Sequence, residues 1–294
     1  MSTVGLCENP QVALEQRTVL RQMQRTASEL WAPGRRWTPG EIAWSILTSS
    51  EDLDVMLLDE GWAWRQDDSV SILAADQKTA RAAIEWAGSS QIEVTDSDSL
   101  LTKEVRRAGY VEVESAPFNV EVRAPITEIP TPKVANGYIF RSSKASDDLL
   151  DVHHSSWRPS DLPFANGYRP SFSENATSPL TKSMLDDVEA NEFYRRELHF
   201  VVEAPDSTLA ASCIVWLDAR TGVSSVEPLG VLPEHRRLGL AGALIQYAVH
   251  AVRAIGGHEV IIHPRGDVAY PAPRGAYLRA GFKTEGRTRV FSKT

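Results

Sequence analysis

The sequence predicts a mixed α/β (α+β) fold made of two similar units, each a mixed central sheet flanked by helices. A strand-like run over 225–231 leads through a glycine turn into an apolar-periodic helix that ends near residue 255, an order typical of α/β units. A helix that ends at glycine occurs twice, at Gly109 and at Gly281. Prolines gather between them. We therefore expect units over 1–125 and 137–294, joined by a linker over 126–136.

The first unit alternates short strands with helices. A helix is expected between the second and third of its strands, over 79–86, because apolar residues recur there at helical spacing. After Gly109, two strand-like runs are expected to pair as a hairpin. The expected strands cover 55–58, 69–73, 91–95, 111–113 and 118–121.

The second unit has more elements, in a comparable order. Its strands are expected at 138–141, 198–203, 210–218, 225–231 and 259–263, with a closing hairpin formed by 283–285 and 289–291. Its helices are expected at 145–157, 180–190 and 240–255. A long segment rich in Pro, Ser and Asn joins the first two of these helices.

Composition and charge exclude several classes of protein. The 294 residues suffice for two domains, and the net charge of −8 without a concentrated basic face argues against a nucleic-acid partner. There is no signal-peptide pattern and no run of eighteen apolar residues, so no membrane span is expected. Cys7 and Cys213 form no disulfide framework, which favours a reducing cytoplasm.

The most informative segment is the turn before the helix at 240–255. It reads Arg236-Arg237-Leu238-Gly239-Leu240-Ala241-Gly242. A helix N-terminus carries unpaired N–H groups and a partial positive charge, and glycine lets the backbone approach a ligand closely. This combination is typical of a site for a pyrophosphate.

The same turn, followed later by Tyr277, Gly281 and Phe282, resembles the GNAT acetyltransferase superfamily over about 137–294. That family has an acetyl-CoA loop of the pattern Arg/Gln-x-x-Gly-x-Gly/Ala and a later Tyr-x-x-x-Gly-Phe element. The resemblance implies acetyl-CoA as the cofactor, with its pyrophosphate on the turn amides and its pantetheine arm along the preceding strand. The implied cofactor-binding residues are Leu229, Gly230, Val231, Arg236, Arg237, Leu238, Gly239, Leu240, Ala241 and Gly242.

The first unit lacks such a turn. Where the resemblance would place it, residues 74–79 read Ala-Ala-Asp-Gln-Lys-Thr, without glycine and without Pro-x-x-Arg. We therefore expect this unit to bind no CoA and to serve as a packing partner and a wall of the substrate site.

Two residues are the candidates for catalysis. Glu227 lies four residues before Val231 on the predicted acetyl-bearing strand, and it is the expected general base, acting through a water. The resemblance implies Tyr277 as general acid, with a phenol pKa near its ordinary value of about 10. The alternatives are an ion pair of Glu227 with Arg236 or Arg274, and a purely structural tyrosine. His263 and Asp267 are reserve candidates for the base.

The acceptor is expected to be the primary amine of a small cationic molecule, such as an amino sugar of an aminoglycoside antibiotic. Residues 141–206 hold twelve Asp and Glu against seven Lys and Arg, and an acidic lining attracts cations. The alternative is that these acids only solvate surface helices. Candidate substrate contacts are His154, Trp157, His263 and Asp267. No metal is expected, because His153 and His154 are adjacent on a predicted helix and their side chains therefore point in different directions.

Three other functions stay open. The chain could acetylate a protein or peptide, could resemble mycothiol synthase, which also has a tandem architecture, or could sense acyl-CoA without turnover. The sequence predicts a small-molecule partner and no membrane partner, and it leaves the oligomeric state open.

Overall fold

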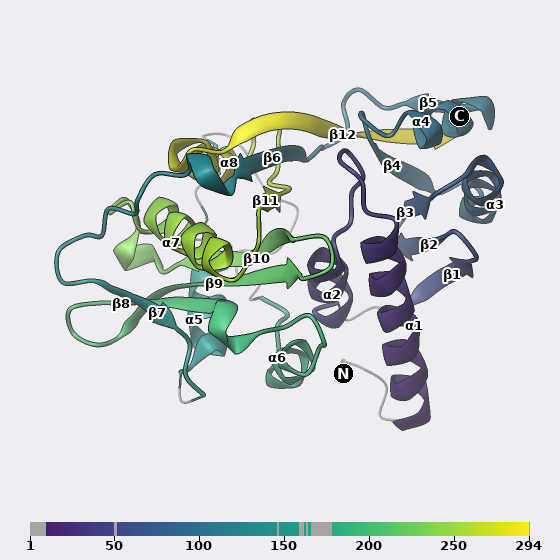
Figure 1. Cartoon of the computed structure of the whole chain (residues 1–294). Coiled ribbons are helices and arrows are strands. Elements are labelled where there is room, and N and C mark those ends of the chain that lie inside the picture. The colour runs from purple at the N-terminus through teal and green to yellow at the C-terminus, as the bar shows by residue number, and fades with distance from the viewer. Residues whose placement is uncertain are drawn as a thin grey trace.

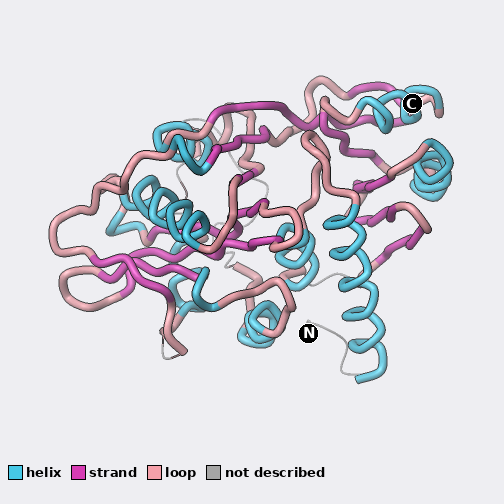
Figure 2. Tube along the Cα trace, viewed as in Figure 1, coloured by secondary structure: helices cyan, strands magenta, loops and turns pink. Residues whose placement is uncertain are grey.

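The computed structural model describes residues 10–49, 52–145, 147–158, 162, 164–165 and 178–293. Its strands form one sheet in the order β1-β2-β3-β4-β12-β6-β11-β10-β9-β8-β7, with β5 paired to β12, and helices cover both faces (Figures 1 and 2). The strands are β1 (Asp54–Leu58), β2 (Gly61–Gln66), β3 (Ser69–Ala74), β4 (Gln91–Thr95), β5 (Tyr110–Glu112), β6 (Val120–Pro125), β7 (Ile139–Ser142), β8 (His199–Glu203), β9 (Leu209–Asp218), β10 (Val223–Val231), β11 (Glu259–Ile262) and β12 (Lys283–Lys293). The α-helices are α1 (Pro10–Glu29), α2 (Pro39–Leu47), α3 (Gln77–Ala87), α4 (Ser99–Arg107), α5 (Leu149–Ser156), α6 (Lys182–Glu189), α7 (Leu240–Ala254) and α8 (Ala272–Ala280).

Each half of the chain contains the same strand–helix–strand arrangement, which confirms the expected fold class. In the first half, β2 and β3 are antiparallel, α3 follows, and β4 returns parallel to β3. In the second half, β9, β10, α7 and β11 repeat this order. In both halves the parallel pairing covers only the start of the first strand, 69–71 or 223–225.

The two expected hairpins do not form, and this prediction was wrong. β5 and β6 both pair with β12, which is one continuous strand. A register shift between Thr284 and Gly286 lets β12 bend from β6 toward β4. As a result, β6 lies between β11 and β12, and the last part of β12 lies between β4 and β5.

This exchange makes the sheet continuous across residues 126–136. Strand β6 of the first half lies between strands β11 and β12 of the second half. Strand β12 in turn pairs with β4 and β5 of the first half. The division into domains at 126–136 therefore stays a prediction about the sequence, whereas the hydrogen-bonded sheet has no break there.

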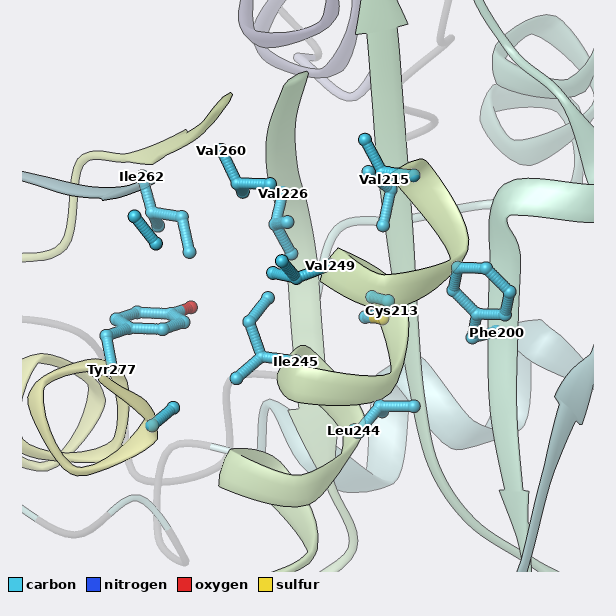
Figure 3. Packing of buried hydrophobic residues seen from close by; sticks show 14 of the residues in the cluster. Phe200, Cys213, Val215, Val226, Leu244, Ile245, Val249, Val260, Ile262 and Tyr277 are labelled. Atoms are coloured by element: carbon cyan, nitrogen blue, oxygen red, sulfur yellow. The ribbon is translucent and has the colours of Figure 1, made fainter. Parts of the chain in front are cut away.

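Strand β9 separates two cores, because its side chains alternate between the two faces of the sheet. Cys213 and Val215 pack with Leu244 and Val249 of α7 in one core, as Figure 3 shows. On the other face, Trp216 and its neighbour Ile214 pack with α1 and α2 residues. Cys213 is a buried core residue, as expected for a strand, and Cys7 lies outside the described residues.

Helix α2, which the sequence analysis did not anticipate, packs directly on β9 and β10. Thr38 caps it, and Glu41 closes the capping box. The Thr38 hydroxyl donates to Ser225 Oγ of β10 at 2.8 Å. A Cβ on Gly40 would lie 2.1 Å from the Cβ of Trp216, so glycine permits this close contact. The N-terminal helix is thereby fixed beside the strand that forms the candidate site.

Candidate active site

The candidate site is the gap that opens where β10 leaves β11. The two strands pair only at 223–225, although β10 continues to Val231. A cavity of about 1830 Å³ occupies this region, with walls from β10, α2, α5, α8 and the start of α7. Typical small-molecule sites measure about 300–1,000 Å³. The cavity therefore has room for a long cofactor and a second substrate.

The free edge of β10 faces this gap. The Leu232 N–H donates to the Ala210 carbonyl at 2.9 Å, which fixes the residues that point toward β9. Because an antiparallel strand alternates its bonding direction, the main-chain groups of Leu229 and Val231 face the gap. The Val231 carbonyl also accepts from Arg236 Nε at 3.1 Å. The main-chain groups of Leu229 thus suit an extended ligand that carries amides.

The turn before α7 is open and points its N–H groups outward. Gly239 takes a φ of +78° and Arg237 a φ of +68°. The Ala243 N–H donates to the Gly239 carbonyl at 3.0 Å, so the N–H groups of 240–242 belong to the helix end that has no intrahelical acceptor. A Cβ on Gly239 or on Gly242 would meet no protein atom within 4 Å. This geometry fits the pyrophosphate of acetyl-CoA.

The two arginines of the turn have different surroundings. Arg237 is exposed and lines the cavity. Arg236 instead donates to the carbonyls of Val231 and Ser156, the latter at 3.0 Å, and so ties the end of β10 to α5. Both arginines place positive charge beside the turn. Arg237 is the exposed one, while the Arg236 side chain also holds two walls of the cavity together.

Glu227 lines the cavity at a bulge in β10. Burial and, next, the charge of Glu41 raise the pKa of its carboxyl, Arg36 and His263 oppose this shift, and the net value is about 7. The expected alternative was an ion pair with Arg236 or Arg274, but both of these arginines contact main-chain carbonyls. A carboxylate with a pKa near neutrality is suited to take a proton at physiological pH.

Tyr277 of α8 belongs both to the core and to the cavity wall. Its side chain is buried, with the ring near Ile245 of α7 and Ile262 of β11 (Figure 3). Burial raises the pKa of this phenol well above its usual range, and the neighbouring acidic groups, Glu227 first, add to the effect. The expectation of an ordinary pKa was wrong, because the ring is enclosed. The phenol keeps its proton at neutral pH and can donate it.

His263 is held as a cation between two carboxylates. Its Nδ1 lies 2.5 Å from Glu41 Oε1, and its Nε2 lies 3.5 Å from Glu121 Oε2. Burial lowers the pKa of this imidazole, but Glu41 and Glu121 raise it more strongly, and the net value is about 9. His263 lines the cavity as expected. A protonated imidazole cannot accept a proton, so this environment favours Glu227 over His263 as the base. The reserve role of His263 stays a prediction.

The other two substrate candidates make local contacts. His154 Nε2 lies 2.6 Å from the Leu180 carbonyl. Asp267 accepts from Arg265 and, at 2.8 Å, from the Ala269 N–H. The residue before His154, His153, lines the cavity beside Trp157. His153 and not His154 therefore lines the cavity, because packing of α5 on the sheet decides which of two adjacent side chains faces inward. A contact of His154 with the substrate stays a prediction.

The expected acidic lining is also absent from the described cavity walls. Those walls contain six Lys and Arg side chains and two Glu, and the lining residues that come from 141–206 include no Asp or Glu. Described acids of that region instead form ion pairs with basic side chains, namely Asp147, Asp186, Asp187, Glu189, Glu192 and Glu203. Acidic side chains therefore give no reason to expect a polycationic acceptor.

Sequence reasoning expected the first unit to form a wall of the substrate site, but it did not identify which residues of that unit line the cavity. It is lined by Arg36, by the α2 residues Glu41, Trp44 and Ser45, and by Thr48, which caps the end of α2. The signal for the helix was available, since Thr38-Pro39 followed by Glu41 is a capping box with proline in the first turn. Within the described residues, no group of three His, Cys, Asp or Glu side chains could hold a metal ion, and no helix is long and apolar enough to cross a membrane.

Comparison with known proteins finds one family match and several structures with the same fold. A model of the acetyltransferase (GNAT) family matches residues 164–282, while a search of curated proteins finds no match. Among solved structures, the chain is similar to a GCN5-related N-acetyltransferase from Sphaerobacter thermophilus, with a TM-score of 0.54, 17% identity, and coverage of 79% of this chain and 76% of that one.

Two further structures share the fold. A tandem GNAT protein from the clavulanic acid biosynthesis pathway gives a TM-score of 0.52 and 15% identity over 98% of this chain and 96% of its own. The C-terminal domain of a putative lysylphosphatidylglycerol synthetase from Agrobacterium fabrum gives a TM-score of 0.57 and 11% identity over 94% of this chain and 93% of its own. These identities speak for the fold alone. Together, the family match over residues 164–282 and these structures show that the chain has the GNAT fold.

Proposed function

We propose that this protein transfers the acetyl group of acetyl-CoA directly to a primary amine of a small molecule, with Glu227 as general base and Tyr277 as general acid. The observation that carries the proposal is the shared cavity. The open turn at Gly239 lies in the wall of the same cavity that holds Glu227 and Tyr277.

The residues around the turn would hold the cofactor. The N–H groups of 238–242 and the Arg237 guanidinium would meet the phosphates, because helix N-termini and cations favour anions. The edge of β10 at Leu229 would pair with the amides of the pantetheine arm. When bound, acetyl-CoA supplies a thioester carbonyl that an amine can attack.

The two catalytic side chains would move the protons. Glu227 takes a proton from the ammonium form of the acceptor, through a water, so that the nitrogen lone pair can form the new N–C bond. As the C–S bond breaks, Tyr277 would donate its phenolic proton to the departing sulfur, and the second proton lost by the attacking nitrogen would restore the phenol through water. The pKa of Glu227 near 7 and the raised pKa of Tyr277 suit these opposite tasks.

The first unit would bind no CoA. At the start of α3, the position that matches the turn before α7, Asp76 caps the helix and accepts from the Thr79 N–H at 2.7 Å. A carboxylate occupies the place where a phosphate would need to bind, and like charges repel. The first unit would instead supply α2 as a wall of the acceptor site.

Thiol release measures this activity directly. The full chain is mixed with acetyl-CoA and, in separate reactions, with small primary amines, a peptide with a free N-terminus and a cysteinyl amino sugar. Release of thiol with a small amine is the expected result. Turnover with peptides alone would replace the proposal by protein acetylation. Turnover with the cysteinyl sugar alone would favour a mycothiol-synthase-like enzyme. Binding of acetyl-CoA without any turnover would point to a sensor.

A further inference from the structure

Two helices each present a stripe of side chains to the cavity. On α2, Glu41, Trp44 and Ser45 line it together with Thr48, which caps the end of α2, and on α5 the stripe is His153, Ser156 and Trp157. Spacings of three and four residues place these side chains on one face of each helix. The stripes meet, since the ring centroids of Trp44 and His153 lie 5.7 Å apart.

Three rings of these stripes form a continuous surface, which we call the aromatic wall: Trp44, His153 and Trp157. His153 and Trp157 are stacked, with centroids 5.9 Å apart and an interplanar angle of 24°. The wall reaches β10, because a Cβ on Gly230 would lie 3.5 Å from Trp157 Nε1. Gly230 and Glu227 both lie on β10, so the wall and the proposed base line the same cavity.

The aromatic wall is uncharged. Burial lowers the pKa of His153 to about 4, with a further contribution from His154, so the imidazole is neutral at physiological pH. Its Nδ1 lies 3.0 Å from the Ser178 hydroxyl, which fixes the ring. The acidic member of the α2 stripe, Glu41, is already paired with His263.

The charges of the described cavity lining as a whole disfavour a polycation. Among the described lining residues, six Lys and Arg oppose two Glu, and like charges repel a ligand that carries several ammonium groups. Flat uncharged rings, in contrast, pack well against an aromatic group and prefer stacked or edge-to-face contacts.

We infer that the acceptor is a primary amine joined by a short chain to an aromatic ring, with the ring on the wall of Trp44, His153 and Trp157 and the amine at Glu227. The inference rests on the proposed amine acetylation and names its substrate class. It also makes Trp44, a residue of the first unit, a determinant of substrate specificity.

The test compares amines that differ in one feature. With saturating acetyl-CoA, kcat/KM is measured for 2-phenylethylamine, n-butylamine, spermidine and glucosamine. The ring should raise kcat/KM by at least about tenfold over n-butylamine, since a tenfold change corresponds to about 1.4 kcal/mol, within the range of a buried aromatic contact.

Variants of α2 assign the effect to the wall. Trp44→Leu should raise KM for 2-phenylethylamine about tenfold and leave KM for acetyl-CoA unchanged, and Trp44→Phe should restore most of the loss. Trp86→Leu, the same change on α3 at a residue outside the cavity lining, is the matched control and should keep the preference for the ring.

The outcomes separate this inference from the proposed function. A preference for spermidine or glucosamine over 2-phenylethylamine overturns the inference, while amine acetylation stands. If no amine releases thiol, the proposed function fails. Calorimetry with 2-phenylethylamine and CoA then tests whether the aromatic wall binds the ring. Saturable binding that Trp44→Leu weakens supports the site, and the absence of binding heat overturns it.

Discussion

Glu41 of α2 and His263, which follows β11, form a buried ion pair with 2.5 Å between Oε1 and Nδ1, although 222 residues separate them in the chain. Burial raises the pKa of the Glu41 carboxyl, but the imidazolium of His263 lowers it, and the net value is about 2. The pKa of His263 is about 9. Both groups are therefore charged at neutral pH. The pair fixes the N-terminal helix against the strand region beside Glu227.

Glu41→Gln should destabilise the protein by about 3–5 kcal/mol, because it leaves a buried cation without its partner. Glutamine keeps the capping box, so the change isolates the charge. The raised pKa of His263 stabilises the fold fully below 6.5, and this contribution is lost as pH rises toward 9. The lowered pKa of Glu41 acts above 4.5 and is lost as pH falls toward 2. The pair thus contributes most between pH 4.5 and 6.5.

Urea unfolding at pH 6 and at pH 9.5 measures the effect, and the difference between wild type and variant should shrink at the higher pH. Lys182→Gln is the control, because it removes an exposed pair with Asp186 on α6, and such pairs contribute little. An equal effect of both substitutions would contradict the prediction.

Local signals allowed much of this fold to be predicted. The strand, the glycine turn and the periodic helix at 225–255 were placed correctly, because their pattern lies within one short stretch of sequence. The pairing of β12 was not predictable in the same way, since a strand pattern does not identify its partner. The same limit applies to Glu41 and His263, whose contact depends on the packing of distant elements. For His153 and His154, the choice depends on the rotation of α5 against the sheet.

The pH dependence of turnover should reflect Glu227. Because the base must be deprotonated and its pKa is about 7, kcat/KM should rise with pH through about this value and then level off. Glu227→Gln should slow turnover by about 10²–10⁴ and remove this rise. Glu234→Gln, an exposed change near the turn, is the matched control. A variant at 227 that keeps the wild-type pH profile would eliminate Glu227 as the base.

Tyr277→Phe should slow turnover while the fold and cofactor binding persist. The substitution keeps the ring in the core and removes the hydroxyl, and a positioned acid contributes a factor of about 10²–10⁴. Tyr247→Phe, on α7 against Phe140 and Phe200, removes a hydroxyl away from the proposed chemistry and should be neutral. Steady-state kinetics and acetyl-CoA titration provide the measurements. An unchanged kcat for Tyr277→Phe would exclude its role as acid.

Binding of acetyl-CoA should stabilise the protein through the turn at Gly239. At about 100 times its Kd, the ligand should add about 2.7 kcal/mol to the free energy of unfolding. Gly242→Glu should abolish this gain by placing a carboxylate against the phosphates. Gly242→Ala should retain it, since a Cβ at this helical position meets no atom within 4 Å. Thermal unfolding with and without acetyl-CoA tests the pair, and equal shifts in both variants would overturn the assignment of the turn.

The exchange of β6 and β12 predicts that the second unit does not fold alone. A chain of residues 137–294 lacks β6, which pairs with both β11 and β12, and it leaves the last part of β12 without β4 and β5. Unpaired backbone groups in a sheet interior are costly and promote aggregation. We expect this fragment to show no cooperative unfolding transition, and co-expression with 1–136 to restore one.

A cut in the segment between the halves separates chain connectivity from sheet completion. A protease site inserted after Thr131, which is exposed, should give a nicked protein whose two pieces stay together, because the exchanged strands still complete both parts of the sheet. Circular dichroism and size-exclusion chromatography follow both experiments. Cooperative unfolding of 137–294 alone would show that β6 is dispensable, and the exchanged strands would then be a contact between two self-sufficient domains.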